Sequence, residues 1–216
     1  MQVAASILDC DFGHLEAELH RLVSAGADWI HLDIMDGHFV PNLSFGTPVL
    51  ELVSRACRLP IDTHLMVECP ERMIPLFLGK SSQVFFHFEA TRQIEHCIAL
   101  VRTAGKRVGV AVRPDTELSG VLSLADRLDA ILIMSVCPGR GGQPFMPESL
   151  VRVSAIRHEV NRRGLQTEIW VDGGVGPGNC DALALAGSDV LVVGSAVCRA
   201  KCPARVIKRL RGHVAP

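Results

Sequence analysis

Four side chains that can bind a metal ion or move a proton stand at the ends of short apolar segments. His31 and Asp33 lie two residues apart in the segment WIHLDIMDG, and in a β-strand this spacing points both side chains to the same side. His64 ends the segment PIDTH, and Asp172 ends the segment EIWVD. Such polar groups are costly to bury without partners, so we predict that they satisfy one another or a cation. One shared metal site explains the pattern better than four separate hydrogen-bonded core residues.

Three glycine-containing segments also follow apolar segments, and their residue types suit the binding of an anion. They are PGRGGQ at residues 138–143, DGG at residues 172–174 and GSA at residues 194–196. Glycine lets backbone N–H groups approach an anion closely, and a helix that starts after such a turn adds the positive end of its dipole. Each segment alone is equally typical of a tight turn. Their shared placement after strands is what favours a phosphate site.

Short apolar segments alternate with amphipathic segments along the whole chain. We expect eight strands, at residues 3–8, 29–33, 61–66, 84–88, 108–112, 130–135, 169–172 and 190–193. Between the first two, apolar residues recur at helical spacing at Leu15, Leu19, Leu22 and Val23. Gly26 then supplies a stop for this helix.

This alternation predicts an α/β fold with a parallel sheet. Eight such units within 216 residues, without a linker or a change of composition, predict one (β/α)8 TIM barrel as a single domain over residues 1–216. A doubly wound open sheet is the alternative fold. In a barrel, chemistry lies at the carboxyl ends of the strands, and phosphate commonly binds after strands seven and eight. The candidate residues occupy those positions.

The overall composition excludes several classes of protein. The 22 Lys and Arg residues nearly balance the 23 Asp and Glu residues, so we expect no nucleic-acid partner. The longest apolar segments are far shorter than the roughly 18 residues that a membrane span needs. The amino terminus has no basic and apolar leader, and none of the eight cysteines forms a C-x-x-C pair. We expect a soluble cytoplasmic protein with free thiols and no membrane partner.

Eight short motifs occur in the order that one known family shows. They are SIL at residues 6–8, HLDIMDGHFVPN at 31–42 followed by Phe45 and Gly46, HLMV at 64–67, HFEA at 87–90, MSV at 134–136, GGQ at 141–143, DGG at 172–174 and GSA at 194–196. Together they resemble the ribulose-phosphate 3-epimerase family, over nearly the whole chain. The resemblance implies a TIM barrel of the ribulose-phosphate-binding type. It also implies an isomerase that interconverts D-ribulose 5-phosphate and D-xylulose 5-phosphate in the pentose phosphate pathway.

The resemblance gives the four candidate ligands their roles. Family members hold one divalent metal ion, commonly zinc with iron, manganese or cobalt as alternatives, on the residues that match His31, Asp33, His64 and Asp172. The residues that match Asp33 and Asp172 also act as the acid/base pair. Inverting a carbon beside a ketone requires removing its proton from one face and returning a proton to the other. A metal ion stabilises the charge of the enediolate that forms between these steps.

The resemblance also implies which residues contact the substrate. Ser6 matches a contact to a substrate hydroxyl, and three methionines match residues that line the reacting centre, although ordinary core packing explains methionines equally well. The full predicted set is Ser6, His64, Met35, Met66, Met134, Gly139, Arg140, Gly141, Gly142, Asp172, Gly173, Gly174, Gly194 and Ser195. We expect a phosphorylated ketose as the substrate and a homo-oligomer as the assembly.

Three positions depart from the family pattern. Arg140 stands where the family usually has Phe, Cys137 where Asn or an acidic residue is common, and Arg113 where Asn is usual. Two additional cations at the mouth of the barrel would strengthen phosphate binding, change the accepted sugar, or point into solvent.

These departures leave two alternative functions open. One is a 3-epimerase of a six-carbon ketose phosphate such as D-allulose 6-phosphate. The other is a phosphate-binding barrel without catalysis, against which the intact Asp33 and Asp172 argue. A related barrel decarboxylase is disfavoured, because the expected third strand carries no lysine.

Overall fold

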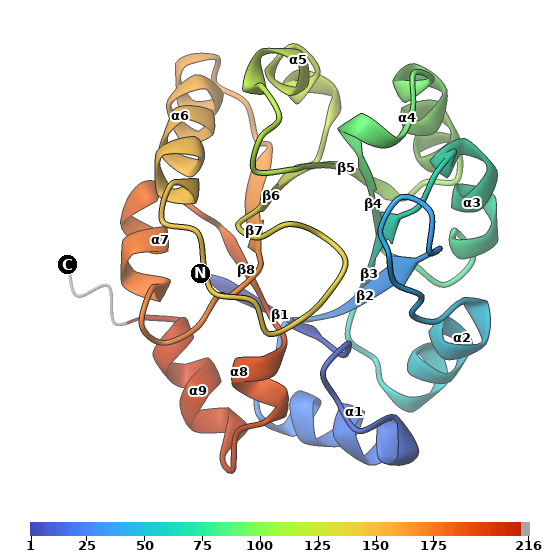
Figure 1. Ribbon diagram of the computed structural model, residues 1–216, viewed down its shortest axis with the longest axis vertical. Helices are drawn as coiled ribbons and strands as arrows, with labels where there is room; N and C mark the ends of the chain where they lie inside the picture. Colours follow the sequence, from blue (N-terminus) through green and yellow to red (C-terminus); the bar gives the residue numbers. More distant parts are fainter. Residues whose placement is uncertain (213–216) are drawn as a thin grey trace.

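The chain folds into a closed barrel of parallel strands with helices around it (Figure 1), and the computed structural model describes residues 1–212. The strands are β1 (Gln2–Ser6), β2 (Trp29–Met35), β3 (Ile61–Met66), β4 (Gln83–His87), β5 (Arg107–Val112), β6 (Ala130–Met134), β7 (Glu168–Asp172) and β8 (Val190–Val193). Each strand pairs in parallel with the next, and β8 pairs with β1. This closure confirms the predicted TIM barrel and rules out the open doubly wound sheet.

Helices follow the strands and cover the outside of the barrel. They are α1 (Leu15–Ser24), α2 (Thr47–Ala56), α3 (Pro70–Phe77), α4 (Ile94–Thr103), α5 (Leu118–Leu122), α6 (Ser149–Arg162), α7 (Cys180–Ala186), α8 (Ser195–Cys198) and α9 (Pro203–Leu210). Three short 3-10 helices are η1 (Phe12–His14), η2 (Phe88–Ala90) and η3 (Ala125–Arg127). The buried face of α1 is formed by Leu15, Leu19 and Leu22. Val23, which shares their helical spacing, is 37% exposed.

Alternate residues of each strand face the helices and the barrel interior. In β2, Ile30 and Leu32 belong to the main core between strands and helices, whereas Trp29 belongs to a separate interior cluster. The period of two places His31 and Asp33 on the same side as Trp29. The candidate ligands of β2 therefore lie inside the barrel.

Aromatic side chains fill the barrel interior on the amino-terminal side of those ligands. The rings of Trp29 and Trp170 meet edge to face with centroids 5.3 Å apart, and Phe85 contacts Trp170 at 5.2 Å. Since this apolar plug closes the amino-terminal half of the barrel, the polar residues are reached only from the carboxyl-terminal end.

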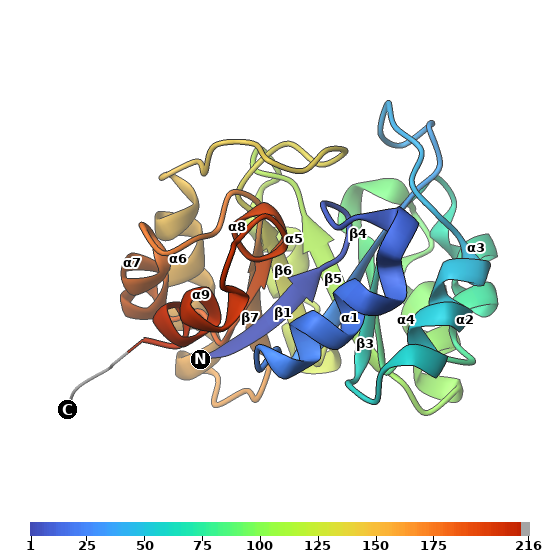
Figure 2. The ribbon, with the colours of Figure 1, turned by 90° about the horizontal axis from the view of Figure 1, so that it is seen from below.

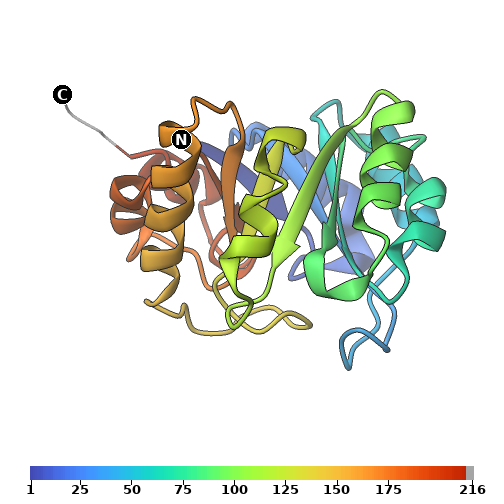
Figure 3. The same cartoon turned by 90° about the horizontal axis from the view of Figure 1, so that it is seen from above.

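Two loops rise over the carboxyl-terminal end of the barrel. Residues 36–46 follow β2 and residues 135–148 follow β6, and Figures 2 and 3 show both loops on the same side of the molecule. The side chain of Asn42 donates a hydrogen bond of 3.0 Å to the carbonyl of Gly139. This bond ties the two loops together across the mouth.

The predicted strands are all present, but their ends are shifted by up to two residues. β2 continues to Met35, because Ile34 and Met35 pair with the end of β3. His31 and Asp33 therefore lie within a strand rather than at its end, and so does His64. Asp172 does end its strand, as predicted.

The structure also bears on two expectations from composition. All eight cysteines carry free thiols. Within residues 1–212, the helices are all too short or too polar to cross a lipid bilayer.

Candidate active site

Four potential metal ligands from three strands meet inside the barrel. Oδ1 of Asp33 lies 3.1 Å from Nε2 of His31 and 3.1 Å from Nδ1 of His64. Oδ2 of Asp172 lies 3.9 Å and 3.7 Å from the same two nitrogens. The register that pairs Asp33 with His64 sets these residues side by side on neighbouring strands. All four ligand atoms lie within 4.8 Å of one another, so the fold brings together the residues that the sequence singled out.

The spacing of these atoms fits a small divalent cation. Ligands placed about 2.1 Å from a tetrahedral metal ion are about 3.4 Å apart. The four nitrogen–oxygen separations in this group, from 3.1 to 3.9 Å, bracket that value. Two imidazole nitrogens and two carboxylate oxygens are donors that zinc and similar divalent ions accept. The group can therefore hold one divalent metal ion.

A buried carboxylate orients His31. Nδ1 of His31 lies 2.5 Å from Oδ1 of Asp62, and both residues are fully buried. Burial opposes protonation of the imidazole, but the negative charges of Asp62 and Asp33 outweigh it and hold the pKa of His31 well above its usual value. This contact directs the other ring nitrogen, Nε2, toward the ligand group.

A hydrogen-bonded chain orients His64 in the same way. Nε2 of His64 lies 3.0 Å from Nε2 of His87, and Nδ1 of His87 lies 3.1 Å from Oε2 of Glu89. Burial lowers the pKa of His87 to about 4, so this ring is neutral and donates from Nδ1 to Glu89. Its Nε2 can then accept the proton of Nε2 of His64, and a neutral His64 in this arrangement has its lone pair on Nδ1. That nitrogen faces Asp33, and two acceptors 3.1 Å apart need a cation or a proton between them.

The two carboxyl groups of the site differ in their tendency to ionise. Burial raises the pKa of Asp172 to about 6, and the charge of Asp33 acts in the same direction. Burial would also raise the pKa of Asp33, but His31 and His64 reverse this and lower it below its usual range. Ser6 donates a hydrogen bond of 2.7 Å to Oδ2 of Asp33. A pair of carboxyl groups with opposite shifts is suited to giving and taking protons.

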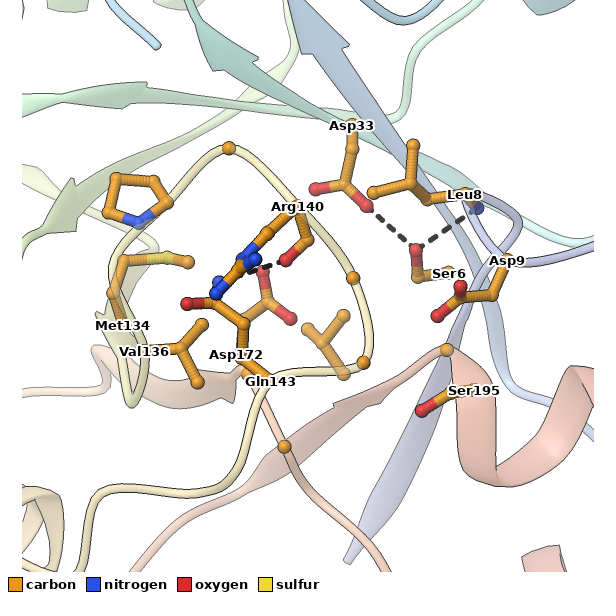
Figure 4. Close-up of a pocket in the computed structure, with 18 of the residues that line it drawn as sticks. Ser6, Leu8, Asp9, Asp33, Met134, Val136, Arg140, Gln143, Asp172 and Ser195 are labelled. Atoms are coloured by element: carbon orange, nitrogen blue, oxygen red, sulfur yellow. Dashed lines mark hydrogen bonds between the residues drawn. The ribbon is translucent and has the colours of Figure 1, made fainter. Parts of the chain in front are cut away.

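A cavity extends from these carboxyl groups to the loops above them. Figure 4 shows Asp33 and Asp172 pointing into it, with Ser6 beside Asp33. The predicted substrate contacts that line the cavity are Ser6, Met35, Met66, Met134, Gly139, Arg140, Gly141, Gly142, Asp172, Gly173, Gly174, Gly194 and Ser195. His64 is the exception, because it is fully buried and does not line the cavity. His64 lies in the candidate metal-ligand group.

The glycine segments allow the loops to pack closely around the outer part of the cavity. Gly174 has a φ of +62°, and a Cβ atom there would lie 2.5 Å from the backbone nitrogen of Phe145. Any side chain at this position would push away the loop that follows β6. Gly141, Gly142 and Gly194 line the same region. Backbone therefore forms this wall, as a site for a phosphate requires.

The three residues that depart from the family pattern, Arg113, Cys137 and Arg140, differ in their position relative to the cavity. The guanidinium of Arg113 lies 4.2 Å above the ring of Phe39 and donates to its carbonyl oxygen at 3.1 Å, so it pins the loop after β2. Arg113 packs on this loop and does not line the cavity. Cys137 is exposed and does not line the cavity, whereas Arg140 does line it.

Sequence comparison now identifies the relatives of this chain. A family model described as the ribulose-phosphate 3 epimerase family matches residues 2–198. The chain belongs to the ribulose-phosphate 3-epimerase family. A "Ribulose-phosphate 3-epimerase, cytoplasmic isoform" from Oryza sativa subsp. japonica is 40% identical over 218 residues, covering 99% of this chain and 94% of the relative. A "Ribulose-phosphate 3-epimerase" from Mycobacterium leprae is 41% identical, covering 99% and 96%.

A more distant solved structure shares the fold of this ribulose-phosphate 3-epimerase family member. The 3-hexulose-6-phosphate synthase of Salmonella typhimurium superposes with a TM-score of 0.71 at 18% identity, covering 97% of this chain and 96% of that one. At this identity the likeness shows the barrel architecture alone.

Sequence reasoning missed several residues of this ribulose-phosphate 3-epimerase site. Asp62 stands two residues before His64 in β3, so strand spacing gave a signal for it, whereas Glu89 lies beyond β4 in η2, where strand spacing does not apply. Asp9 also lines the cavity and pairs with Arg199, which is 190 residues away in the sequence. No local sequence pattern predicts a contact between residues so far apart in the chain.

Proposed function

We propose that the protein is a metal-dependent 3-epimerase that interconverts D-ribulose 5-phosphate and D-xylulose 5-phosphate. The observation that carries the proposal is that Asp33 and Asp172 point into one cavity while sharing a metal-ligand group with His31 and His64. The names of the relatives at 40% and 41% identity specify the substrate class.

The proposed reaction inverts C3 of the ketose phosphate through a 2,3-enediolate. One carboxylate removes the C3 proton, and the carboxyl group opposite returns a proton to the other face. Asp33 and Asp172 exchange these roles in the reverse direction. A divalent metal ion held by His31, Asp33, His64 and Asp172 would stabilise the negative charge on the substrate oxygens. The bond from Ser6 holds the carboxylate of Asp33 in place.

The rest of the cavity would bind the sugar and its phosphate. Backbone of the glycine segments would hold the phosphate, at Gly141, Gly142, Gly173, Gly174, Gly194 and Ser195. Met35, Met66 and Met134 line the cavity with apolar, polarizable surface near the carboxyl groups. The aromatic cluster in the amino-terminal half of the barrel would keep water from reaching the site from that end.

We extend the proposal to five further properties of the protein. Zinc is the metal that the donor set fits best, and metal analysis of purified protein checks it. The predicted single domain spans residues 1–216, of which 213–216 lie outside the described residues, and the enzyme acts in the cytoplasm, in the pentose phosphate pathway. The name of the rice relative, a cytoplasmic isoform, supports this compartment. A homo-oligomer is expected, which size-exclusion chromatography with light scattering measures.

A substrate panel tests the proposed function directly. We expect D-ribulose 5-phosphate to be converted with a kcat/KM at least about 10-fold above that of D-allulose 6-phosphate, because the cavity must discriminate one added CHOH group. The unphosphorylated pentulose should react poorly. A preference for the hexulose phosphate would replace the proposal with the six-carbon alternative. Failure to convert any ketose phosphate by metal-loaded protein would indicate a binding barrel without catalysis.

Arg140 offers a test of how the loop after β6 contributes. It lines the cavity from the loop that covers the mouth. We expect Arg140→Phe to raise KM for the ketose phosphate about 3- to 10-fold and to change kcat less, because a phosphate contact is made in both ground and transition states. Steady-state kinetics measure this. An unchanged KM for both five- and six-carbon substrates would show that Arg140 is a solvated surface residue.

A further inference from the structure

An ion pair stands at the rim of the cavity, beside the glycine segments. Asp9 follows β1 and lines the cavity, where Figure 4 shows it near Ser6 and Ser195. Arg199 follows α8, and its Nη2 donates to Oδ1 of Asp9 at 2.7 Å. The pair connects the segments that follow the first and the last strand of the barrel, β1 and β8, which are neighbours.

Both members of this pair lie against the backbone that we assign to phosphate binding. A Cβ atom on Gly141 would lie 2.6 Å from Oδ2 of Asp9, and one on Gly194 would lie 3.4 Å from it. A Cβ atom on Gly142 would lie 3.9 Å from Nη2 of Arg199. The carboxylate of Asp9 therefore reaches the proposed phosphate-binding backbone, which we call the phosphate cradle (residues 141–142, 173–174 and 194–195). The guanidinium of Arg199 lies at the outer edge of this cradle.

The negative charge of Asp9 opposes the binding of an anion, whereas the positive charge of Arg199 supports it. The side chain of Asp9 is 13% exposed, so solvent screens its charge only weakly, whereas that of Arg199 is 68% exposed. A carboxylate at this place repels a phosphate dianion unless a cation compensates it. Arg199 is the cation within hydrogen-bond distance of Asp9 among the residues that the structure describes.

We propose that Arg199 neutralises Asp9, and that this ion pair sets the affinity of the cradle for phosphate. The inference rests on the proposed function, because it takes a phosphorylated ketose as the ligand. Arg199 acts through Asp9 rather than on the reacting carbon. Loss of the guanidinium would leave an uncompensated negative charge next to the phosphate, whereas loss of both charges would restore neutrality.

A single variant and a double variant test this role. We expect Arg199→Ala to raise KM for D-ribulose 5-phosphate about 10-fold and to change kcat less than about 3-fold, because the affected interaction is binding. Asp9→Asn combined with Arg199→Ala should return KM to within about 2-fold of the wild-type value.

The matched control is Arg211→Ala, which removes another exposed arginine from an ion pair of the same length. Nη2 of Arg211 lies 2.7 Å from Oδ1 of Asp28, which precedes β2 at the opposite end of the barrel. This control should leave KM unchanged. Melting temperatures without ligand establish that each variant is folded.

Inorganic phosphate is the probe that separates binding from catalysis. The thermal stabilisation that it gives should need about 10-fold more phosphate in Arg199→Ala and a near wild-type concentration in the double variant. If the double variant binds as weakly as Arg199→Ala, the guanidinium contacts phosphate itself and neutralisation is wrong. Unchanged binding in Arg199→Ala also overturns the inference. If the wild-type protein neither binds phosphate nor epimerises, the proposed function fails instead.

Discussion

Treatment with a strong chelator is expected to lower epimerase activity by at least about 10³-fold, because a metal ion bound at the proposed site would stabilise the enediolate charge by several kcal/mol. Adding Zn²⁺, Mn²⁺, Fe²⁺ or Co²⁺ should restore activity. The purified protein should contain about one divalent ion per chain, since the four ligand atoms within 4.8 Å form one site. Elemental analysis before and after chelation, together with the rate at each stage, measures both effects.

Variants of two histidines separate this metal role from a general effect of chelation. His64→Ala should lose bound metal, because it removes a ligand atom 3.1 Å from the carboxylate of Asp33. His14→Ala should retain it, because the side chain of His14 is 78% exposed on the surface. Full activity in protein shown to contain no metal would rule out the catalytic role of the ion.

Asp33→Asn and Asp172→Asn are each expected to lower kcat by at least about 10²-fold, because each replaces a positioned acid/base with an amide that cannot exchange a proton. Both residues are also candidate ligands, so the rates are to be compared at saturating metal with the bound ion measured. Asp181→Asn is the control, since Asp181 is an exposed carboxylate paired with Arg209. It should keep wild-type kinetics.

Solvent deuterium distinguishes the proposed proton transfers from other routes to the same product. In D₂O, the wild-type enzyme should place deuterium at C3, because the proton that is returned comes from a carboxyl group that exchanges with solvent. Nuclear magnetic resonance of the product detects this label. Product formed without deuterium at C3 would favour internal transfer of the substrate proton. If Asp33→Asn and Asp172→Asn each kept kcat within about 3-fold of the wild type, neither carboxyl group would act in the mechanism.

Much of the fold and of the site follows from local patterns in the sequence. The alternation of apolar strands with amphipathic helices predicts the barrel, because each pattern reports which face of an element is buried. His31 and Asp33 share a strand face by their spacing alone. The glycines after the last three strands predict where an anion binds, since parallel strands end on the same side of a barrel.

The tertiary structure decided what local patterns cannot carry. β2 runs on to Met35 because of its pairing with β3, and the side chain of Arg113 stacks on the ring of Phe39 in the loop after β2.

Strand register and side-chain orientation also fixed two groups of contacts in the site. The sequence by itself determined that His64 and Asp172 would face the interior, but not that His87 would fix the tautomer of His64. The pairing of Asp9 with Arg199 exists only because β1 and β8 become neighbours when the barrel closes. Spacing along the chain encodes which way a side chain points, whereas closure of the sheet determines what it meets.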